Sequence, residues 1–189
     1  NAAYRNLKYI FPGAAVYINR NEPGYWDSLS NFESKQLYLV ITGRFNADKD
    51  EMRRLHTFVE AGNTVFISAR FIGQEAEDFL DCETNAYDFL SFFADESATT
   101  DSMSTELLRP PFDKQTSYSY PGKRFDAVFT RIDSTATEVI GKNQNGRANF
   151  IRMRAGKGSF YLHLSPLSFS NYFLLHKNNI GYYENVLSA

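Results

Sequence analysis

The spacing of hydrophobic residues changes about halfway along the chain. In the first half, short apolar runs alternate with stretches in which apolar residues recur every three or four positions, as on one face of a helix. Beyond residue 104, apolar and polar residues alternate, which is typical of strands with one buried face. The first pattern predicts strands joined by helices, and the second predicts a run of short strands separated by turns.

The clearest pattern lies in residues 46–73, NADKDEMRRLHTFVEAGNTVFISARFIG. Asp48 and Glu51 have capping-box spacing, which predicts the start of a helix. A stripe of apolar residues at helical spacing follows, and Gly62 is the expected left-handed stop. Residues 64–68, TVFIS, then predict a buried strand.

Residues 36–42, QLYLVIT, precede this unit as a continuous apolar run, which predicts a strand covered on both faces. A strand, a helix and a strand in this order favour a right-handed crossover between parallel strands. The length of 189 residues suits one domain with a substantial core. The predicted fold class is therefore α/β: a mainly parallel sheet flanked by helices, with antiparallel strands added in the C-terminal half.

The other elements are predicted from shorter patterns. Helices are expected at residues 2–11, 73–93, 166–175 and 179–188. Strands are expected at residues 14–18, 117–120, 125–130, 136–140, 148–154 and 159–164. Polar loops are expected at residues 19–33 and 95–104, and Asn145 with Gly146 is typical of a hairpin turn.

Composition argues against several classes of partner, cofactor and covalent link. The net charge is −2 and no basic tract occurs, which argues against nucleic acid as the partner. The single cysteine, Cys82, excludes an internal disulfide and a multi-cysteine metal site. The three histidines lack metal-ligand spacing, so neither a metal nor another cofactor is expected. No apolar run approaches the roughly 20 residues that span a bilayer.

Three stretches together resemble a known group: VITGRF, FVEAGNTVFIS, and AGKGSFYLHLSPLSFSNYFLLHKNN followed by YYENVLS. They are similar to a bacterial family of unknown function whose domain has a class I glutamine amidotransferase-like, flavodoxin-like fold. The resemblance covers most of the chain and is strongest over residues 36–73 and 154–188. It implies a membrane-anchored protein whose domain is periplasmic or otherwise extracytoplasmic, with a cytoplasmic location as the alternative. Both chain ends read as cut from something longer, so membrane contact is expected only through segments outside this chain.

The resemblance also implies which positions would form a catalytic triad. In active class I amidotransferases a cysteine on a tight turn is the nucleophile, and a histidine and a glutamate spaced H-x-E complete the site. The nucleophile position falls at Ala69, between Ser68 and Arg70. His163 is kept, but Ser165 stands where the glutamate would be. Two of the three triad members are missing, so the resemblance implies no catalytic residues.

The same positions are candidates for ligand binding, because open α/β sheets bind ligands at the carboxyl ends of their parallel strands. The candidates are Thr42, Gly43, Arg44, Ser68, Ala69, Arg70, His163 and Ser165. Arg44 and Arg70 could hold a carboxylate or phosphate, or form ordinary surface salt bridges. Cys82, at the end of a predicted helix, is expected to be a buried structural thiol.

Two functions compete. One is a non-catalytic binding or scaffolding domain that recognises an unknown protein partner or a small ligand; the missing triad and the aromatic residues in predicted loops and turns favour it. The other is a hydrolase or amidotransferase-like enzyme in which Ser68 replaces the cysteine and His163 is its base. A hydrogen bond between Ser68 and His163 in an open cleft would favour the enzyme. A cytoplasmic small-molecule sensor is a third possibility.

Overall fold

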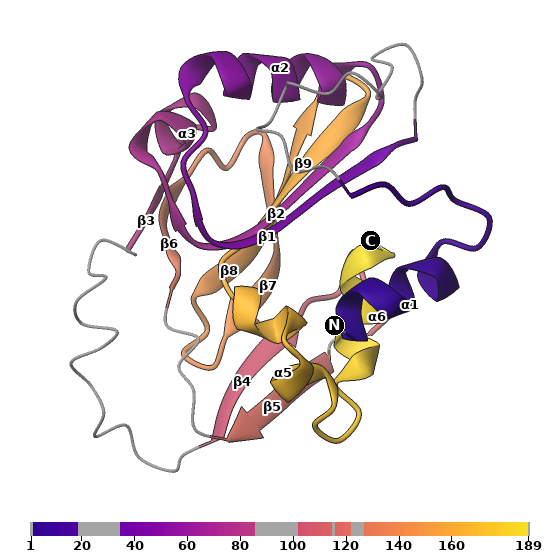
Figure 1. The fold of residues 1–189 in the computed structure, drawn as a ribbon. Coiled ribbons are helices and arrows are strands. Elements are labelled where there is room, and N and C mark those ends of the chain that lie inside the picture. Colours follow the sequence, from indigo (N-terminus) through magenta and orange to yellow (C-terminus); the bar gives the residue numbers. More distant parts are fainter. Residues whose placement is uncertain (1, 19–34, 86–101, 115, 122–126, 189) are drawn as a thin grey trace.

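The computed structural model describes residues 2–18, 35–85, 102–114, 116–121 and 127–188 (Figure 1). The strands in these residues are β1 (Leu37–Phe45), β2 (Thr64–Ile72), β3 (Cys82–Thr84), β4 (Ser102–Leu107), β5 (Thr116–Pro121), β6 (Phe129–Ile132), β7 (Thr137–Asn143), β8 (Ala148–Ala155) and β9 (Gly158–His163). The helices are α1 (Ala2–Ile10), α2 (Lys49–Glu60), α3 (Gln74–Phe79), the 3-10 helix η1 (Pro166–Phe169), α5 (Asn171–Leu174) and α6 (Ile180–Leu187). None of the helices in this part of the chain combines the length and the apolar character needed to cross a bilayer.

Seven of the described strands form one mixed sheet in the order β1-β2-β9-β8-β7-β4-β5, and β3 pairs with β6 separately. The β1–β2 and β2–β9 pairings are parallel. The four remaining pairings of the large sheet are antiparallel. The α/β class and the antiparallel strands of the C-terminal half are therefore confirmed. The prediction of a mainly parallel sheet was wrong, because most of the strands are joined through hairpins and meanders.

The β1–α2–β2 unit forms as its sequence predicts. Asp48 Oδ1 accepts hydrogen bonds from the backbone N–H groups of Asp50 and Glu51, at 2.9 and 2.8 Å. Glu51 Oε2 accepts in turn from the Asp48 N–H, which completes the capping box. Gly62 follows with a φ of +103°, a conformation that glycine adopts without a steric penalty. The local signals at both ends of α2 thus set its boundaries.

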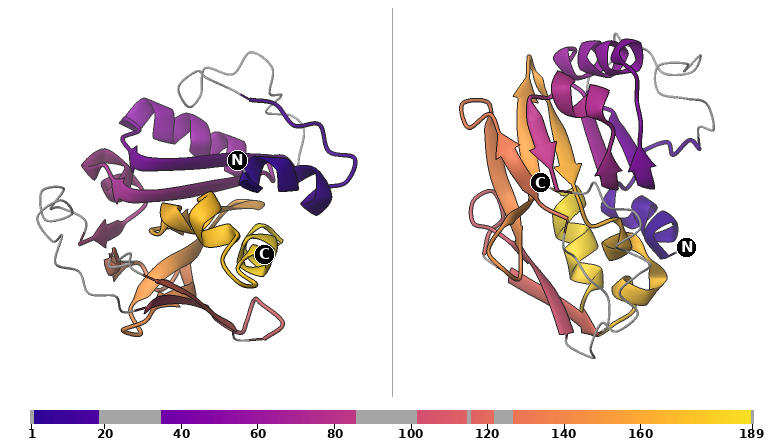
Figure 2. Two further views of the ribbon diagram at one scale, coloured as in Figure 1. Left: turned by 60° about the horizontal axis from the view of Figure 1, so that its bottom comes forward. Right: turned by 90° about the vertical axis from the view of Figure 1, so that its left-hand side faces the viewer.

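Helices cover both faces of the large sheet, as Figure 2 shows. α2 and α3 cover one face, and the core beneath them, here the α2-side core, contains mainly aliphatic side chains such as Leu55, Val65, Ile67 and Leu162. The helices α1, η1, α5 and α6 cover the other face. Their core is here called the aromatic core, and its members include Phe66, Phe150, Tyr161, Phe169, Phe173, Tyr182 and Tyr183.

Several predicted elements differ from the structure. Residues 14–18 have no regular secondary structure and are exposed, so the predicted strand there was wrong. The predicted helix over residues 73–93 ends at Phe79, and Cys82–Thr84 then forms a strand; residues 86–93 lie outside the described part. Leu37 to Val40 are only half-buried, because β1 is an edge strand of the described sheet.

In the second half, residues 102–104 begin β4 although they were predicted as loop. The strand predicted over residues 125–130 begins at Phe129, and Phe125 and Asp126 are outside the described residues. The loop predicted over residues 19–33 lies outside the description as well. The hairpin turn is confirmed, with Gly146 at a φ of +72° between β7 and β8.

Candidate functional site

A hydrogen-bonded chain of three side chains lies in the aromatic core. Ser68 on β2 is in register with His163, the last residue of the parallel neighbour β9. Ser68 Oγ lies 2.7 Å from His163 Nδ1, and His163 Nε2 lies 2.6 Å from the hydroxyl oxygen of Tyr182 on α6. All three residues have 0% exposed surface. Sheet register and the final helix therefore assemble a Ser–His–Tyr chain that solvent does not reach.

The surroundings of His163 fix its protonation state. Its ring packs edge-on against Phe150 and Phe169, with centroid distances of 5.2 and 5.3 Å. Burial lowers the pKa of His163 from 6.5 to about 3, because the imidazolium would have to give up its hydration. Burial likewise raises the pKa of Tyr182, although the nearby hydroxyls of Thr105 and Ser168 act in the opposite direction. The chain is therefore neutral near pH 7.

A neutral imidazole has one N–H donor and one acceptor nitrogen. One of the two hydroxyls therefore accepts a hydrogen bond from His163 while the other donates to it, and either tautomer satisfies both nitrogens. This accounts for every polar atom of the ring. A satisfied buried polar group fixes the relative positions of the elements that carry it, here β2, β9 and α6.

Further polar side chains lie buried near the Ser–His–Tyr chain. Asn149 Nδ2 on β8 donates to Thr105 Oγ1 at 3.3 Å and lies 3.5 Å from Ser165 Oγ. Among the described residues, Asn149 Oδ1 has no hydrogen-bond partner. Ser165 thus belongs to a neighbouring buried group and does not orient His163. The nitrogen that a triad carboxylate would bind is occupied by the Tyr182 phenol.

The Ser68–His163 pair has the distance that nucleophilic catalysis requires, but not its surroundings. A serine nucleophile needs a base that can take its proton and an opening through which substrate reaches Oγ. Here the base titrates near pH 3, its other nitrogen meets a phenol in place of a carboxylate, and both residues are fully buried. In this conformation the pair acts as a hydrogen-bonded link in the core.

The tight turn expected at residues 68–70 was a wrong prediction. β2 continues through these residues to Ile72, so Ser68, Ala69 and Arg70 are in the interior of a strand. Side chains alternate between the two faces of a sheet, and Ala69 therefore packs in the α2-side core while Ser68 faces the aromatic core. The position that the resemblance assigns to a nucleophile is neither exposed nor on the same face as His163.

Two of the remaining candidates, Arg44 and Arg70, lie near the ring of Phe71, and Thr42 and Gly43 precede Arg44 on β1. The guanidinium carbons of Arg44 and Arg70 lie 5.2 and 5.6 Å from the Phe71 ring centroid, within the range of cation–π contacts. Thr42 Oγ1 donates to the carbonyl oxygen of Arg44 at 3.1 Å, and Gly43 is exposed. The eight candidates are thus divided among three surroundings: the Ser–His–Tyr chain with its buried neighbours, the α2-side core, and the end of β1 with the neighbouring Arg70.

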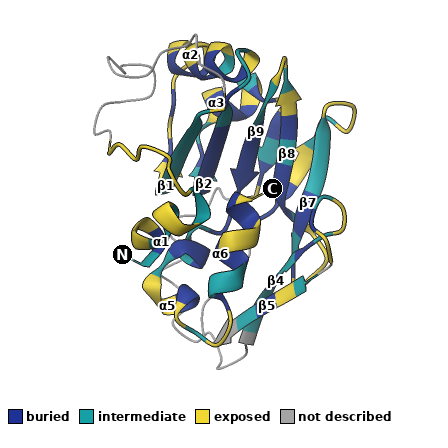
Figure 3. Ribbon diagram, turned by 90° about the vertical axis from the view of Figure 1, so that its right-hand side faces the viewer, coloured by how far each residue is buried: buried dark blue, intermediate teal, exposed yellow. Residues whose placement is uncertain are grey.

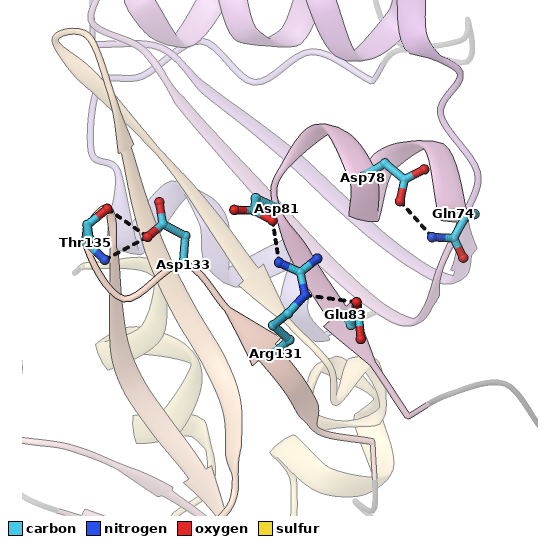
Figure 4. A network of polar contacts seen from close by, with 7 residues as sticks. All are labelled: Gln74, Asp78, Asp81, Glu83, Arg131, Asp133 and Thr135. Carbon is cyan, nitrogen blue, oxygen red and sulfur yellow. Dashed lines mark hydrogen bonds and ion pairs between the residues drawn. The ribbon is translucent and has the colours of Figure 1, made fainter.

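Cys82 lies in β3 instead of at a helix end, and it is buried as expected. Burial raises the pKa of its thiol to about 12, so the thiolate is not available near pH 7. Asp81 and Glu83, the sequence neighbours of Cys82, form ion pairs with Arg131 on β6 (Figure 4). These ion pairs join β6 to β3. This network is exposed and holds two short strands together. Across the described residues, no group of three or more His, Cys, Asp or Glu side chains could hold a metal.

Tyr182 is the member of the Ser–His–Tyr chain that sequence reasoning missed. Its helix was predicted over residues 179–188, but a tyrosine in an apolar helix gives no local sign of a hydrogen-bond partner. The partner is 19 residues away, and only packing of α6 on the sheet brings the two together.

Comparison with known proteins places the chain in a family but gives no activity. No curated protein matches its sequence. Among solved structures it is similar to the exo-beta-1,4-mannosidase Op5Man5 from Opitutaceae bacterium strain TAV5, with 16% identity, a TM-score of 0.47, and 82% of this chain and 25% of that chain covered. A beta-galactosidase from Bacillus circulans sp. alkalophilus shows 14% identity, a TM-score of 0.44, and 69% and 20% coverage.

This chain spans a quarter or less of either glycosidase, and both likenesses are distant. The amidotransferase-like, flavodoxin-like fold stays a prediction. The family described as Domain of unknown function (DUF4350) matches residues 13–187, which agrees with the resemblance to a family of unknown function. The chain belongs to this family.

Proposed function

We propose that this chain is a non-catalytic binding or scaffolding domain of a membrane-anchored protein, which recognises another protein or a small ligand. The observation that carries the proposal is the complete burial of Ser68 and His163 beneath aromatic side chains and α6. A catalytic pair requires contact with substrate, whereas a buried and satisfied polar chain stabilises one arrangement of the core.

The proposal includes descent from an amidotransferase-like domain that has lost its triad. Support comes from the β1–α2–β2 unit and from the residues at the triad positions. Ala69 lacks a nucleophile, and Ser165 lacks the carboxylate that would orient His163. The histidine of the triad has in this view been retained for packing and hydrogen bonding.

A second candidate function is a hydrolase or amidotransferase-like enzyme that uses Ser68 and His163. The 2.7 Å distance between Ser68 Oγ and His163 Nδ1 favours it. Such an enzyme would have to displace α6 to admit substrate, and its base would gain strength only as His163 became hydrated.

Labelling with a fluorophosphonate, which reacts with activated serine hydroxyls, distinguishes the two functions. The chain should show no labelling above that of a Ser68→Ala variant, with intact folding of both checked by circular dichroism. Labelling that maps to Ser68 and disappears in the variant would overturn the non-catalytic proposal. Hydrolysis of an activated ester such as p-nitrophenyl acetate gives an independent readout on the same two proteins.

The extracytoplasmic location is part of the same proposal. Its test is to fuse the full-length gene product, at the end of this domain, to a reporter enzyme that folds only outside the cytoplasm. Reporter activity with the protein in the membrane fraction is the expected result. An inactive reporter, together with a fluorescent fusion that matures inside the cell, would favour the cytoplasmic alternative.

A further inference from the structure

Exposed large apolar side chains are concentrated in two segments. Eight such side chains occur among the described residues, and seven of them lie in residues 4–18 or 172–175. Tyr9 and Leu175 are 72% and 73% exposed. Concentration of this kind marks an interaction surface, whereas single exposed apolar residues scattered over a surface would not.

The helices of the two segments, α1 and α5, lie next to each other, and four of the seven side chains lie on them or at their ends: Tyr4, Tyr9, Tyr172 and Leu175. The N–H of Ala2 donates to Asn171 Oδ1 at 2.7 Å, which joins α1 to α5. The Tyr183 hydroxyl donates to the carbonyl oxygen of Ala3 at 2.8 Å, which holds the inner side of α1 against α6. Figure 3 shows exposed parts of α1 and α5 on the same side of the molecule.

The outward side of α1 carries two tyrosines and two basic residues. Tyr4 and Lys8 are four positions apart, as are Arg5 and Tyr9, so each pair lies along one side of the helix. Lys8 Nζ lies 5.3 Å from the centroid of the Tyr9 ring. We define the α1–α5 face as Tyr4, Arg5, Lys8, Tyr9, Tyr172 and Leu175.

The two segments that carry this face contain basic residues and no acidic ones. Residues 2–18 and 165–183 contain no Asp or Glu, and in the sequence the first acid after the second segment is Glu184 on α6. The exposed basic residues of the two segments are Arg5, Lys8 and Lys177. The whole chain has a net charge of −2, so this local excess of positive charge contrasts with the average composition.

We infer that the α1–α5 face docks on an anionic lipid surface. Tyrosine is favoured at the boundary between acyl chains and water, and basic side chains are drawn to anionic headgroups. Protein interfaces, in contrast, are depleted in lysine, and two of the three exposed basic residues of the two segments are lysines. This inference goes beyond the proposed function, because it gives the domain a membrane contact of its own in addition to any anchor outside the chain.

The test is co-sedimentation of the 189-residue chain with lipid vesicles. One set consists of phosphatidylcholine alone, and in the other about a third of the lipid is anionic phosphatidylglycerol. The chain should bind the anionic vesicles and not the neutral ones. Changing Arg5→Glu and Lys8→Glu together should lower the partition coefficient about tenfold or more, since each basic residue near the surface adds attraction.

The double substitution Arg154→Glu with Lys157→Glu is the matched control. Both residues are exposed, and they are an Arg and a Lys with the same spacing as Arg5 and Lys8. They flank the β8–β9 turn, where Gly156 packs against Glu60 at the end of α2, away from α1. The control should bind as the unmodified chain does. Tyr9→Ser with Leu175→Ser should also weaken binding, which separates insertion of apolar groups from charge attraction alone.

Three results would overturn the inference: no sedimentation of the unmodified chain with anionic vesicles, equal sedimentation with both vesicle types, or equal losses in the α1 variant and the control. The first would indicate that a protein covers the face. Circular dichroism establishes that each variant is folded, and these substitutions touch only exposed side chains. None of these results bears on whether Ser68 is labelled, so the proposed function fails or stands separately.

Discussion

Phe66 and Ile67 are neighbours in β2, yet they belong to different cores. Ile67 lies in the α2-side core, which is covered by helices that follow β1 and β2 directly in the sequence. Phe66 lies in the aromatic core, which is covered by the two ends of the chain. One face of the sheet is therefore assembled from local segments, and the other depends on contacts between residues far apart in sequence.

The two cores also differ in chemistry. The α2-side core is mainly apolar, and burial of apolar side chains stabilises without requiring particular directions. The buried Glu77 of α3 accepts hydrogen bonds on this side from Thr84, which is only seven residues away. The aromatic core contains the Ser68–His163–Tyr182 chain, whose hydrogen bonds require particular positions of β2, β9 and α6. The comparison suggests that the first core supplies general stability while the second fixes the placement of the terminal helices.

The largest expected effect comes from truncating the two neighbours in β2. Phe66→Ala should lower the free energy of unfolding by about 3–5 kcal/mol, because the ring packs against Phe150, Tyr161 and Phe169. Ile67→Ala should cost about 2–5 kcal/mol on the other face. Urea unfolding followed by circular dichroism measures both. A loss near zero at Phe66 would mean that the aromatic core is not packed as described.

The pH dependence of stability isolates the contribution of His163. Its pKa is about 3 in the folded chain and near 6.5 when hydrated, so below pH 6.5 the unfolded chain binds a proton that the folded chain does not. Stability is therefore complete above pH 6.5 and falls as the pH drops toward 3. Between pH 6.5 and 5 the loss should be about 2 kcal/mol.

His163→Gln is the reference protein for that measurement, because glutamine does not titrate and has both a donor and an acceptor. The stability difference between the unmodified chain and the variant should shrink by about 2 kcal/mol from pH 7 to pH 5. His56 and His176 are present in both proteins and cancel in the comparison. An unchanged difference would show that His163 is hydrated in solution.

Removing a single hydroxyl tests the other end of the hydrogen-bonded chain. Tyr182→Phe keeps the ring but leaves His163 Nε2 without its partner, and the free energy of unfolding should fall by about 1–2 kcal/mol. Tyr172→Phe is the matched control, since Tyr172 is 58% exposed and its change should stay within about 0.5 kcal/mol. Equal effects of the two substitutions would mean that the Tyr182 hydroxyl does not bond His163 in the core as described.

The smallest expected effect lies at the start of α2. Asp48→Ala removes the side chain that accepts from two backbone N–H groups, and it should cost about 1 kcal/mol. Because α2 is joined to the sheet by local connections, the loss should be confined to that helix. Amide hydrogen exchange should speed up in the first turn of α2 and remain unchanged in α6.

The β1–α2–β2 unit could be predicted because each of its boundaries has a local cause. The Asp48 capping box begins α2, and Gly62, with its positive φ, follows the C-terminal end of the helix. Apolar runs form the strands on either side of it. The predicted helix over residues 73–93 failed for the opposite reason. Asp81 adopts a φ of +48°, and Cys82–Thr84 forms a strand because β6, about 50 residues later, supplies its partner.

The candidate site was predictable only in part. Sequence resemblance singled out both Ser68 and His163, and parallel register brings them into contact. The resemblance could not show that β2 runs on to Ile72, so that no turn exposes Ala69. Nor could it show that Tyr182 closes the far side of His163, because that contact depends on how α6 packs. Direction and burial of side chains are properties of the assembled core.

The hydrogen bond from Tyr183 to Ala3 has a consequence for protein engineering. It places the first and last helices of this chain side by side, on the same sheet face. A linker between residues 1 and 189, with new ends opened at the Asn145–Gly146 turn, would give a circular permutant with every described strand pairing available. If such a permutant folds, the fold does not require the elements to follow one another in their natural order along the chain.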